Sequence, residues 1–208
     1  MAQIPITYPI QPSEATASFD YADIQEGTGV TVYNLARAEV SGGTITSILS
    51  RAEVYSEFFE VSGASSIGKI SDIDYDVIFA RPQNIKGTAY ANISHVCLPS
   101  GGASDSFLVV RARKWDGTTE TELANATSRV LSSAAAAAHK VQLIPLVLPL
   151  THFKKDETFR LTVEAWSSGV NGTFGYGVDP QNRTAGWLHL NGPFVSKSTL
   201  NLPFVLKI

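Results

Sequence analysis

The chain has 208 residues, of which 44% are hydrophobic and 17% charged, and its formal net charge is −3. This length allows one large domain with its own core, so that folding requires no metal ion or disulfide. The charge provides no basic excess to pair with phosphates, which argues against a nucleic-acid partner. The single cysteine, Cys97, excludes a disulfide within the chain and is expected to be buried and inert.

The first segment, residues 1–17, is rich in proline and carries apolar side chains between the prolines. Proline fixes φ and removes a backbone donor, which favours an extended conformation. We therefore expect an extended N-terminal arm that lies on a neighbouring molecule, with packing along its own domain or disorder as the alternatives. It has neither the positive start nor the apolar run of a secretory signal. The residues expected to make the contact are Ile4, Pro5, Ile6, Tyr8, Pro9 and Ile10.

Strand patterns begin at Ser18. Phe19 and Tyr21 alternate with polar residues, a turn is expected at Glu26–Gly29, and a strand follows over Val30–Tyr33. Gly42-Gly43 breaks the pattern, and residues 44–61 are β-prone with an ambiguous centre that also has some helical spacing.

The segment from Asp72 to Phe79 alternates apolar residues with three aspartates. The aspartates would lie about 7 Å apart on one strand face, which favours a solvated face over a calcium site completed by a loop. The next strand is expected over residues 85–98, where His95 shares a face with small and apolar residues. A hydrogen-bonded core histidine is therefore expected rather than a ligand.

A long hairpin is predicted over residues 106–131 and organises the chain. Asp116-Gly117 is a strong turn signal, because glycine adopts positive φ without steric cost. In the first strand Leu108 and Val110 point to one side, whereas Arg111 and Arg113 point to the other.

The last third of the chain contains three informative stretches. The alanine-rich residues 132–138 predict a short helical turn. Residues 141–150 predict a buried or edge strand, interrupted by Pro145 and Pro149 and too short to span a bilayer. Residues 159–166 alternate cleanly, with Trp166 pointing outward. Shorter strands are expected over residues 171–180, 187–190 and 200–208.

These patterns predict an all-β protein. About eight to ten strands, with turn signals at regular spacing, are typical of an antiparallel β-sandwich. No linker or internal repeat divides the chain, so residues 18–208 are expected to form a single β-sandwich domain behind the arm of residues 1–17.

The sequence carries no motif of a known reaction centre, and we expect no catalytic, cofactor-binding or metal-binding residues. A pair of carboxylates brought together by folding is the enzymatic alternative. In the turn-rich residues 177–183, Asp179 and Asn182 are suited to capping the backbone, and Arg183 to pairing with a carboxylate. A structured loop and a subunit-contact loop are both consistent with this pattern. The outward Trp166 is consistent with a protein contact or with stacking on a sugar.

Several phrases, in order, resemble virion proteins of tailed phages and environmental viruses: FDYADIQEGTGVTVYN, IKGTAYANI, RKWDGTTETELA, LTHFKKDETFRLTVEAW and GYGVDPQNR. The resemblance runs from about Ser18 to Arg183. It implies a jelly-roll sandwich and a capsid decoration, cement or minor capsid protein. Such proteins commonly form trimers, and the resemblance transfers no catalytic residues.

We therefore expect a non-enzymatic protein on the outer surface of a virion capsid. Its expected partners are the major capsid protein and sister copies, most simply in a homotrimer, with no nucleic acid, membrane or cofactor. The alternative is a receptor- or carbohydrate-binding module of a virion fibre or tail.

Overall fold

A computed structural model describes residues 28–40, 44–56, 58–64, 67–100, 102–134, 136–168, 172–183 and 195–205. These residues form 12 β-strands and no helix, so the prediction of an all-β protein is confirmed. No helix among them is long and apolar enough to cross a membrane. The N-terminal arm and the strand expected over residues 187–190 lie outside the described residues. The strands are β1 (Thr28–Val40), β2 (Thr44–Ser50), β3 (Glu60–Ala64), β4 (Gly68–Ile78), β5 (Gln83–Pro99), β6 (Ser104–Trp115), β7 (Glu120–Thr127), β8 (Leu131–Ser133), β9 (Ala138–Phe153), β10 (Thr158–Ser167), β11 (Gly172–Gly177) and β12 (Thr199–Val205).

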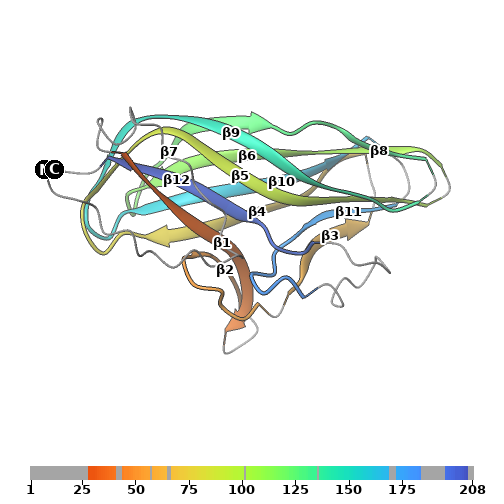
Figure 1. Cartoon of the computed structure of the whole chain (residues 1–208), viewed down its shortest axis with the longest axis horizontal. Coiled ribbons are helices and arrows are strands. Elements are labelled where there is room, and N and C mark those ends of the chain that lie inside the picture. The colour runs from red at the N-terminus through yellow and green to blue at the C-terminus, as the bar shows by residue number, and fades with distance from the viewer. Residues whose placement is uncertain are drawn as a thin grey trace, which may run out of the picture.

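The strands belong to one hydrogen-bonded sheet. The long strands run roughly along the long axis of the molecule, and the sheet curls around that axis (Figure 1). Its order is β3-β11-β5-β12-β1-β2-β4-β10-β6-β7, with β8 paired to β6 and β9 paired to β5. Neighbouring strands run antiparallel except β2 and β4, which meet at a single parallel pair, Ile48 and Asp76. The sheet is therefore mixed. The half that runs from β3 to β2 in this order, with β9, is joined to the half that runs from β4 to β7, with β8, by this single backbone pair.

Aromatic side chains fill the space between the two halves. The ring centroid of Phe79, just after β4, lies 5.1 Å from that of Phe153 on β9 and 5.9 Å from that of Phe204 on β12. At a second point Tyr75 of β4 donates a hydrogen bond of 3.3 Å to the hydroxyl of Tyr176 on β11. One contiguous cluster of buried side chains contains residues from both halves. Burial of this shared apolar surface is the main source of stability.

The predicted hairpin is present as β6 and β7. Gly117 has φ of 99°, and Oδ1 of Asp116 accepts hydrogen bonds from the backbone nitrogens of Thr118 (2.9 Å) and Thr119 (2.7 Å). These bonds lower the pKa of the Asp116 carboxyl. Leu108 and Val110 are fully buried, as their alternation predicted. The returning strand is shorter than expected, because β7 ends at Thr127 and β8 begins only at Leu131.

Two expectations for local structure are changed by pairing with distant strands. The helical turn predicted over residues 132–138 is wrong: Ser132 and Ser133 pair with β6, and no described residue of the stretch is helical. Few alanines cannot hold a helix without packing, so the sheet contact decides. Residues 44–61 form β2, an irregular loop and β3, so their β-prone reading applies to the two ends only.

His95 and Cys97 lie on the inward face of β5 and are fully buried. Nε2 of His95 lies 2.8 Å from Oγ of Ser106 on β6, whereas its Nδ1 is buried without a hydrogen-bond partner. Burial, assisted by His139, lowers the pKa of His95 to about 3, and the pKa of the Cys97 thiol is raised to about 11 by burial and by Asp105. Both residues have the structural roles expected of them.

We expect the buried His95 to make folding sensitive to acid. Below about pH 6.5 the unfolded chain binds a proton that the folded chain does not accept until about pH 3, so stability is lost as the pH falls. Between pH 7 and pH 5 this site should remove about 2 kcal/mol from the free energy of unfolding. Urea unfolding at the two pH values should show a correspondingly smaller loss for His95→Gln. His152→Gln, which changes an exposed histidine, serves as the control. The same loss in His95→Gln and the unaltered chain would contradict the assignment.

Candidate functional site

The outer face of β4, β10, β6 and β7 is covered by charges that bind one another. Nε and Nη2 of Arg160 donate to the two carboxylate oxygens of Asp76, each at 2.8 Å, and its Nη1 donates to Glu120 at 2.9 Å. Arg113 binds the second oxygen of Glu120 at 3.0 Å. These contacts raise the pKa of Arg160. The charges on this polar face are thus largely neutralised within the chain.

The aspartates of β4 belong to the same network. Asp74 accepts a hydrogen bond of 2.6 Å from Thr162, and Asp72 pairs with Lys69 at 2.6 Å. Among the described residues no group of three or more His, Cys, Asp or Glu side chains could hold a metal ion. The row forms an outward polar strand face, with its acids held by basic and hydroxyl groups of this chain.

Trp166 lies on the polar face, as predicted, and is held by its neighbours. Its ring stacks on Phe107 of β6, with centroids 6.1 Å apart and planes inclined by 6°, and its Nε1 donates to Glu164 at 2.8 Å. Glu164 in turn accepts from Nε of Arg111 at 3.0 Å. One side of the indole is therefore occupied, and Glu164 is buried although it points outward.

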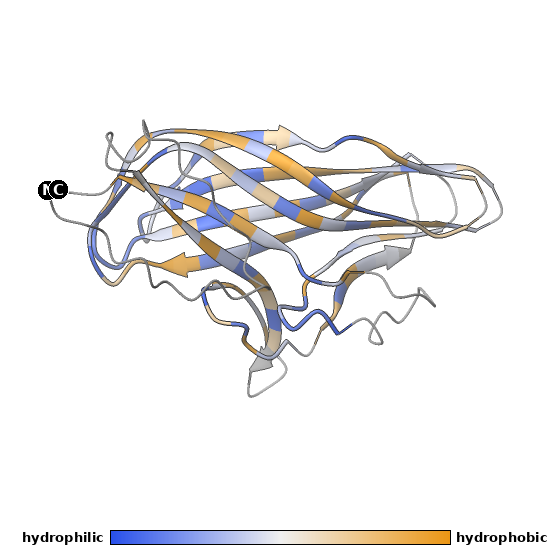
Figure 2. Cartoon of the chain, viewed as in Figure 1, coloured by the Kyte–Doolittle hydropathy of each residue, from blue (hydrophilic) through white to orange (hydrophobic). Residues whose placement is uncertain are grey.

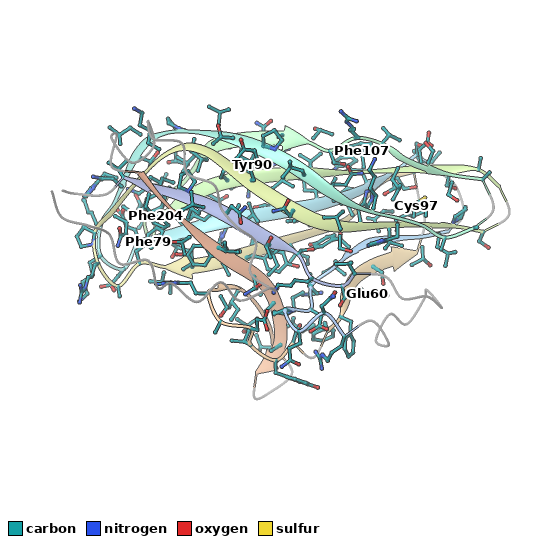
Figure 3. The ribbon with its side chains drawn as sticks, viewed as in Figure 1. Glu60, Phe79, Tyr90, Cys97, Phe107 and Phe204 are labelled. Carbon is teal, nitrogen blue, oxygen red and sulfur yellow. The ribbon has the colours of Figure 1, made fainter. Side chains whose placement is uncertain are left out.

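The opposite outer face, formed by β9, β5, β12 and β1, carries exposed apolar residues on β9, β5 and β1. Alternate residues of β9 are exposed from Val141 to Pro149, among them Leu143 (62%), Pro145 and Val147 (74%). In the register of the sheet, Pro145 lies beside Tyr90, Tyr90 beside Asn201, and Asn201 beside Val32. We define the apolar face as the exposed residues Val30, Val32, Tyr90, Val141, Leu143, Pro145 and Val147. Hydrophobic residues recur along β9 in Figure 2, and Tyr90 is labelled in Figure 3.

The sequence of β9 explains why both of its sides are apolar. Ile144, Leu146 and Leu148 point into the core, so the intervening Leu143 and Val147 must point to solvent. A strand with one solvated face normally alternates apolar and polar residues, whereas a continuous apolar run is typical of a strand that is covered on both faces. The run LIPLVLPL was the available signal for this surface, and the surface itself was not among the predicted contact residues.

The loop predicted to carry contact residues is bound tightly to its own chain. The side chain of Asp179 is fully buried and accepts hydrogen bonds from the backbone nitrogens of Gln181 and Arg183 and from the guanidinium of Arg183. Asn182 has φ of 54°, and its Oδ1 accepts from the backbone nitrogen of Ser196 at 2.9 Å. Capping by Asp179 and pairing by Arg183 are as predicted, whereas Asn182 caps a distant segment instead of its own turn. A contact of these residues with a partner stays a prediction.

Arg183 joins this turn to the loop before β3. Its guanidinium lies 4.5 Å from the ring centroid of Tyr55 and 4.4 Å from that of Phe59, and Nη2 donates to the carbonyl of Ser56. Pairing with Asp179 raises the pKa of Arg183. Tyr55 is 62% exposed, and sequence patterns did not single it out because these contacts depend on folding.

A serine and a histidine also meet within the described residues. Oγ of Ser94 lies 2.7 Å from Nε2 of His139, and it donates its proton to the carbonyl of Val195. Ser94 is fully buried, and burial lowers the pKa of His139. A nucleophilic serine needs an accessible oxygen whose proton is directed at its base. The Ser94 oxygen is buried and its proton is directed to a carbonyl, so this pair joins β5, β9 and the segment before β12.

No protein-family model matches the chain, and no curated protein matches its sequence. Among solved structures, it is similar to a CocE/NonD family hydrolase from Staphylococcus aureus (13% identity, TM-score 0.51) and to an aminopeptidase from the marine sediment archaeon Thaumarchaeota archaeon (9% identity, TM-score 0.52). These matches cover 86% and 85% of this chain, which spans only 37% of each of those chains. A match to a structure of infectious bursal disease virus, Gt strain, covers 98% of this chain and 41% of that one at 12% identity, but its TM-score of 0.26 carries no argument. The first two similarities concern the fold alone.

We expect Asp179→Asn to destabilise the protein, because the fully buried carboxylate is the shared acceptor of the 179–183 turn. Weakening hydrogen bonds to a buried charged group typically costs about 1–3 kcal/mol. Urea unfolding would measure the loss. Glu53→Gln is the matched control, since it breaks the exposed ion pair with Lys197 in the same region and should cost less than about 1 kcal/mol. Equal costs for the two changes would show that Asp179 is not the anchor of this turn.

Proposed function

We propose that the chain is a non-enzymatic structural protein of a virion: a capsid decoration or cement protein that binds and stabilises the major capsid shell. The observation that carries the proposal is the apolar face, whose exposed residues lie on β9, β5 and β1 with Asn201 of β12 between Tyr90 and Val32. The resemblance of residues 18–183 to virion proteins supplies the class of partner. The outer capsid surface, the jelly-roll description of the sandwich and the N-terminal arm are parts of the same proposal.

The two outer faces of the molecule suit different surroundings. Large exposed apolar patches on soluble proteins commonly mark interaction sites, and the buried centres of interfaces are depleted of charge. Leu143, Val147 and Tyr90 are exposed, largely apolar and uncharged, so they suit the buried centre of an interface. The polar face satisfies its charges internally through Arg160, Asp76 and Glu120. In the proposed orientation the apolar face is turned toward capsid subunits and sister copies, and the polar face toward solvent.

Association through the apolar face needs more area than a few side chains provide. A stable interface buries about 800 Å² on each partner, roughly 20–30 residues a side. The arm of residues 1–17, with Ile4, Ile6, Tyr8 and Ile10, would add contact area on a neighbour. A homotrimer around a three-fold axis would let each copy hold the next as well as the shell.

The alternative of a carbohydrate- or receptor-binding module has less support from the geometry. A sugar stacks on an open aromatic face, whereas one side of the Trp166 ring is covered by Phe107 and its Nε1 is bonded to Glu164. The likeness to a hydrolase and an aminopeptidase rests on fold and covers 37% of those chains. Neither observation favours a second function over the proposed one.

We expect Leu143→Asp/Val147→Asp to abolish attachment while leaving the fold intact, because both side chains are exposed in the isolated chain. Burying two unpaired carboxylates should weaken binding at least about 100-fold, since each 1.4 kcal/mol is a factor of ten. Co-sedimentation with capsids of the encoding virus would measure binding, and light scattering would report the oligomeric state. Ile67→Asp, an exposed apolar position outside this face (68%), is the control. Unchanged binding by the double variant would remove the apolar face from the proposal.

Deletion of residues 1–17 should reduce occupancy on capsids without lowering the thermal unfolding temperature. The physical reason is the loss of contact area outside the folded body. The matched control replaces Ile4, Ile6, Tyr8 and Ile10 by serine and keeps the length of the segment. Full occupancy in both variants would show that the arm does not contribute to attachment.

A further inference from the structure

Each edge of β1 pairs with a described strand along only one half of its length. Residues Thr28–Asn34 pair with β12, and residues Asn34–Val40 pair with β2. On the side of β2, no described strand pairs with Thr28–Tyr33. Six residues of this edge, about 20 Å at 3.3 Å per residue, therefore have no neighbouring strand among the described residues.

β4 borders the same space from the other side. It pairs with β10 along its length, and its opposite edge meets β2 only at the pair of Ile48 and Asp76. β2 ends at Ser50, and the chain then turns away, with Nδ2 of Asn34 donating to the carbonyls of Ser50 and Ala52. The position between β1 and β4 that β2 occupies along one half of β1 is thus continued by no described strand along the other half.

A cavity of about 760 Å³ occupies this position. Its walls come from β1, the end of β2, the end of β4 and β12. The buried aromatic rings of Tyr33, Phe79 and Phe204 line it, together with Leu49. Phe79 and Phe204 lie next to each other in Figure 3. The inward positions of β1 at the open end are small: Gly29 and Thr31, which also line the cavity.

These features describe an acceptor for one extended segment with large apolar side chains. An unpaired strand edge binds an extended chain through backbone hydrogen bonds, and pockets for alternate side chains provide specificity. Here the edge is Thr28–Tyr33, and the room lies beside the small residues Gly29 and Thr31. An occupant with two aromatic residues at alternate positions would fill the space that these two residues leave.

We propose that residues Ser18–Ala22 of this chain are that occupant, paired antiparallel to β1 with Phe19 and Tyr21 in the cavity. The five residues 23–27 would form the connection, a common hairpin loop length. β12 already covers one edge of β1, so a hairpin formed by the preceding residues has the other edge available. This register places Tyr21 opposite Gly29 and Phe19 opposite Thr31. The inference does not depend on the proposed function.

Disulfide trapping in the full-length chain tests both the site and the register. In the proposed pairing Asp20 lies opposite Val30, with Cα atoms about 4.5–5.5 Å apart, which is within the range of a disulfide. Oxidation of Asp20→Cys/Val30→Cys should give a disulfide-linked peptide within one molecule, seen by mass spectrometry, and a monomer on a non-reducing gel. Cys97 can stay in place because it is buried and burial, assisted by Asp105, raises its pKa to about 11.

The control is Tyr21→Cys/Val30→Cys, in which the two thiols would point to opposite faces of the sheet. Its disulfide yield should be at least several-fold lower. Equal yields, a higher yield in the control or no disulfide in either pair would overturn the proposal. Disulfide-linked dimers would overturn it in favour of strand exchange with a second copy.

A second measurement follows the cavity itself. Phe19→Ala/Tyr21→Ala should open the cavity and increase the fluorescence of the apolar dye ANS at least several-fold. Ile4→Ala/Ile6→Ala, with apolar residues removed from the arm instead, should leave ANS fluorescence unchanged. Equal ANS fluorescence of Phe19→Ala/Tyr21→Ala and the unaltered chain would contradict the proposed filling of the site, because the exposed apolar face contributes the same background to both.

Discussion

Contact between the two halves of one curled sheet is the constraint on which the structure depends. Only at a single parallel pair, Ile48 with Asp76, does backbone pairing join β2 to β4. The halves are therefore held mainly by side chains, with Phe79 between Phe153 and Phe204 and the hydroxyls of Tyr75 and Tyr176 in contact. Because apolar burial is non-directional, such a junction tolerates a gap in strand pairing beside it. The cavity between β1 and β4 lies at this junction.

The composition of the two outer faces depends on which residues alternate with the buried inward residues of each strand. Strands β4, β6 and β10 alternate, so their outward positions are free to carry charge, and cross-strand pairs such as Arg160 with Asp76 neutralise it. β9 is apolar at both sets of positions, so its outward residues Leu143 and Val147 remain exposed in the isolated chain. A protein built in this way has one face rich in paired charges and one face with exposed apolar side chains.

For this chain, similarity of fold to solved structures gives no evidence of function. Two solved structures with a comparable fold are a hydrolase and an aminopeptidase, and each match covers 37% of those chains. The serine and histidine that meet here, Ser94 and His139, are buried and direct the serine proton to a backbone carbonyl. Function therefore has to be argued from surfaces, since a fold hosts many unrelated activities.

Local pattern alone determined the all-β class, the Asp116-Gly117 hairpin and the inward positions of β6 and β10, because strand alternation and turn chemistry act over a few residues. It also determined that Asp179 caps the backbone of the 179–183 turn, whereas the partner of Asn182, Ser196, lies 14 residues away. Only the tertiary structure decided that residues 131–133 form a strand, since their partner, β6, lies far enough away in sequence to be invisible to local propensity. The same holds for the neighbours of Trp166 and for the alignment of Tyr90 with Pro145, Asn201 and Val32. These surfaces depend on strand order and register, which arise when distant segments pair across the whole sheet.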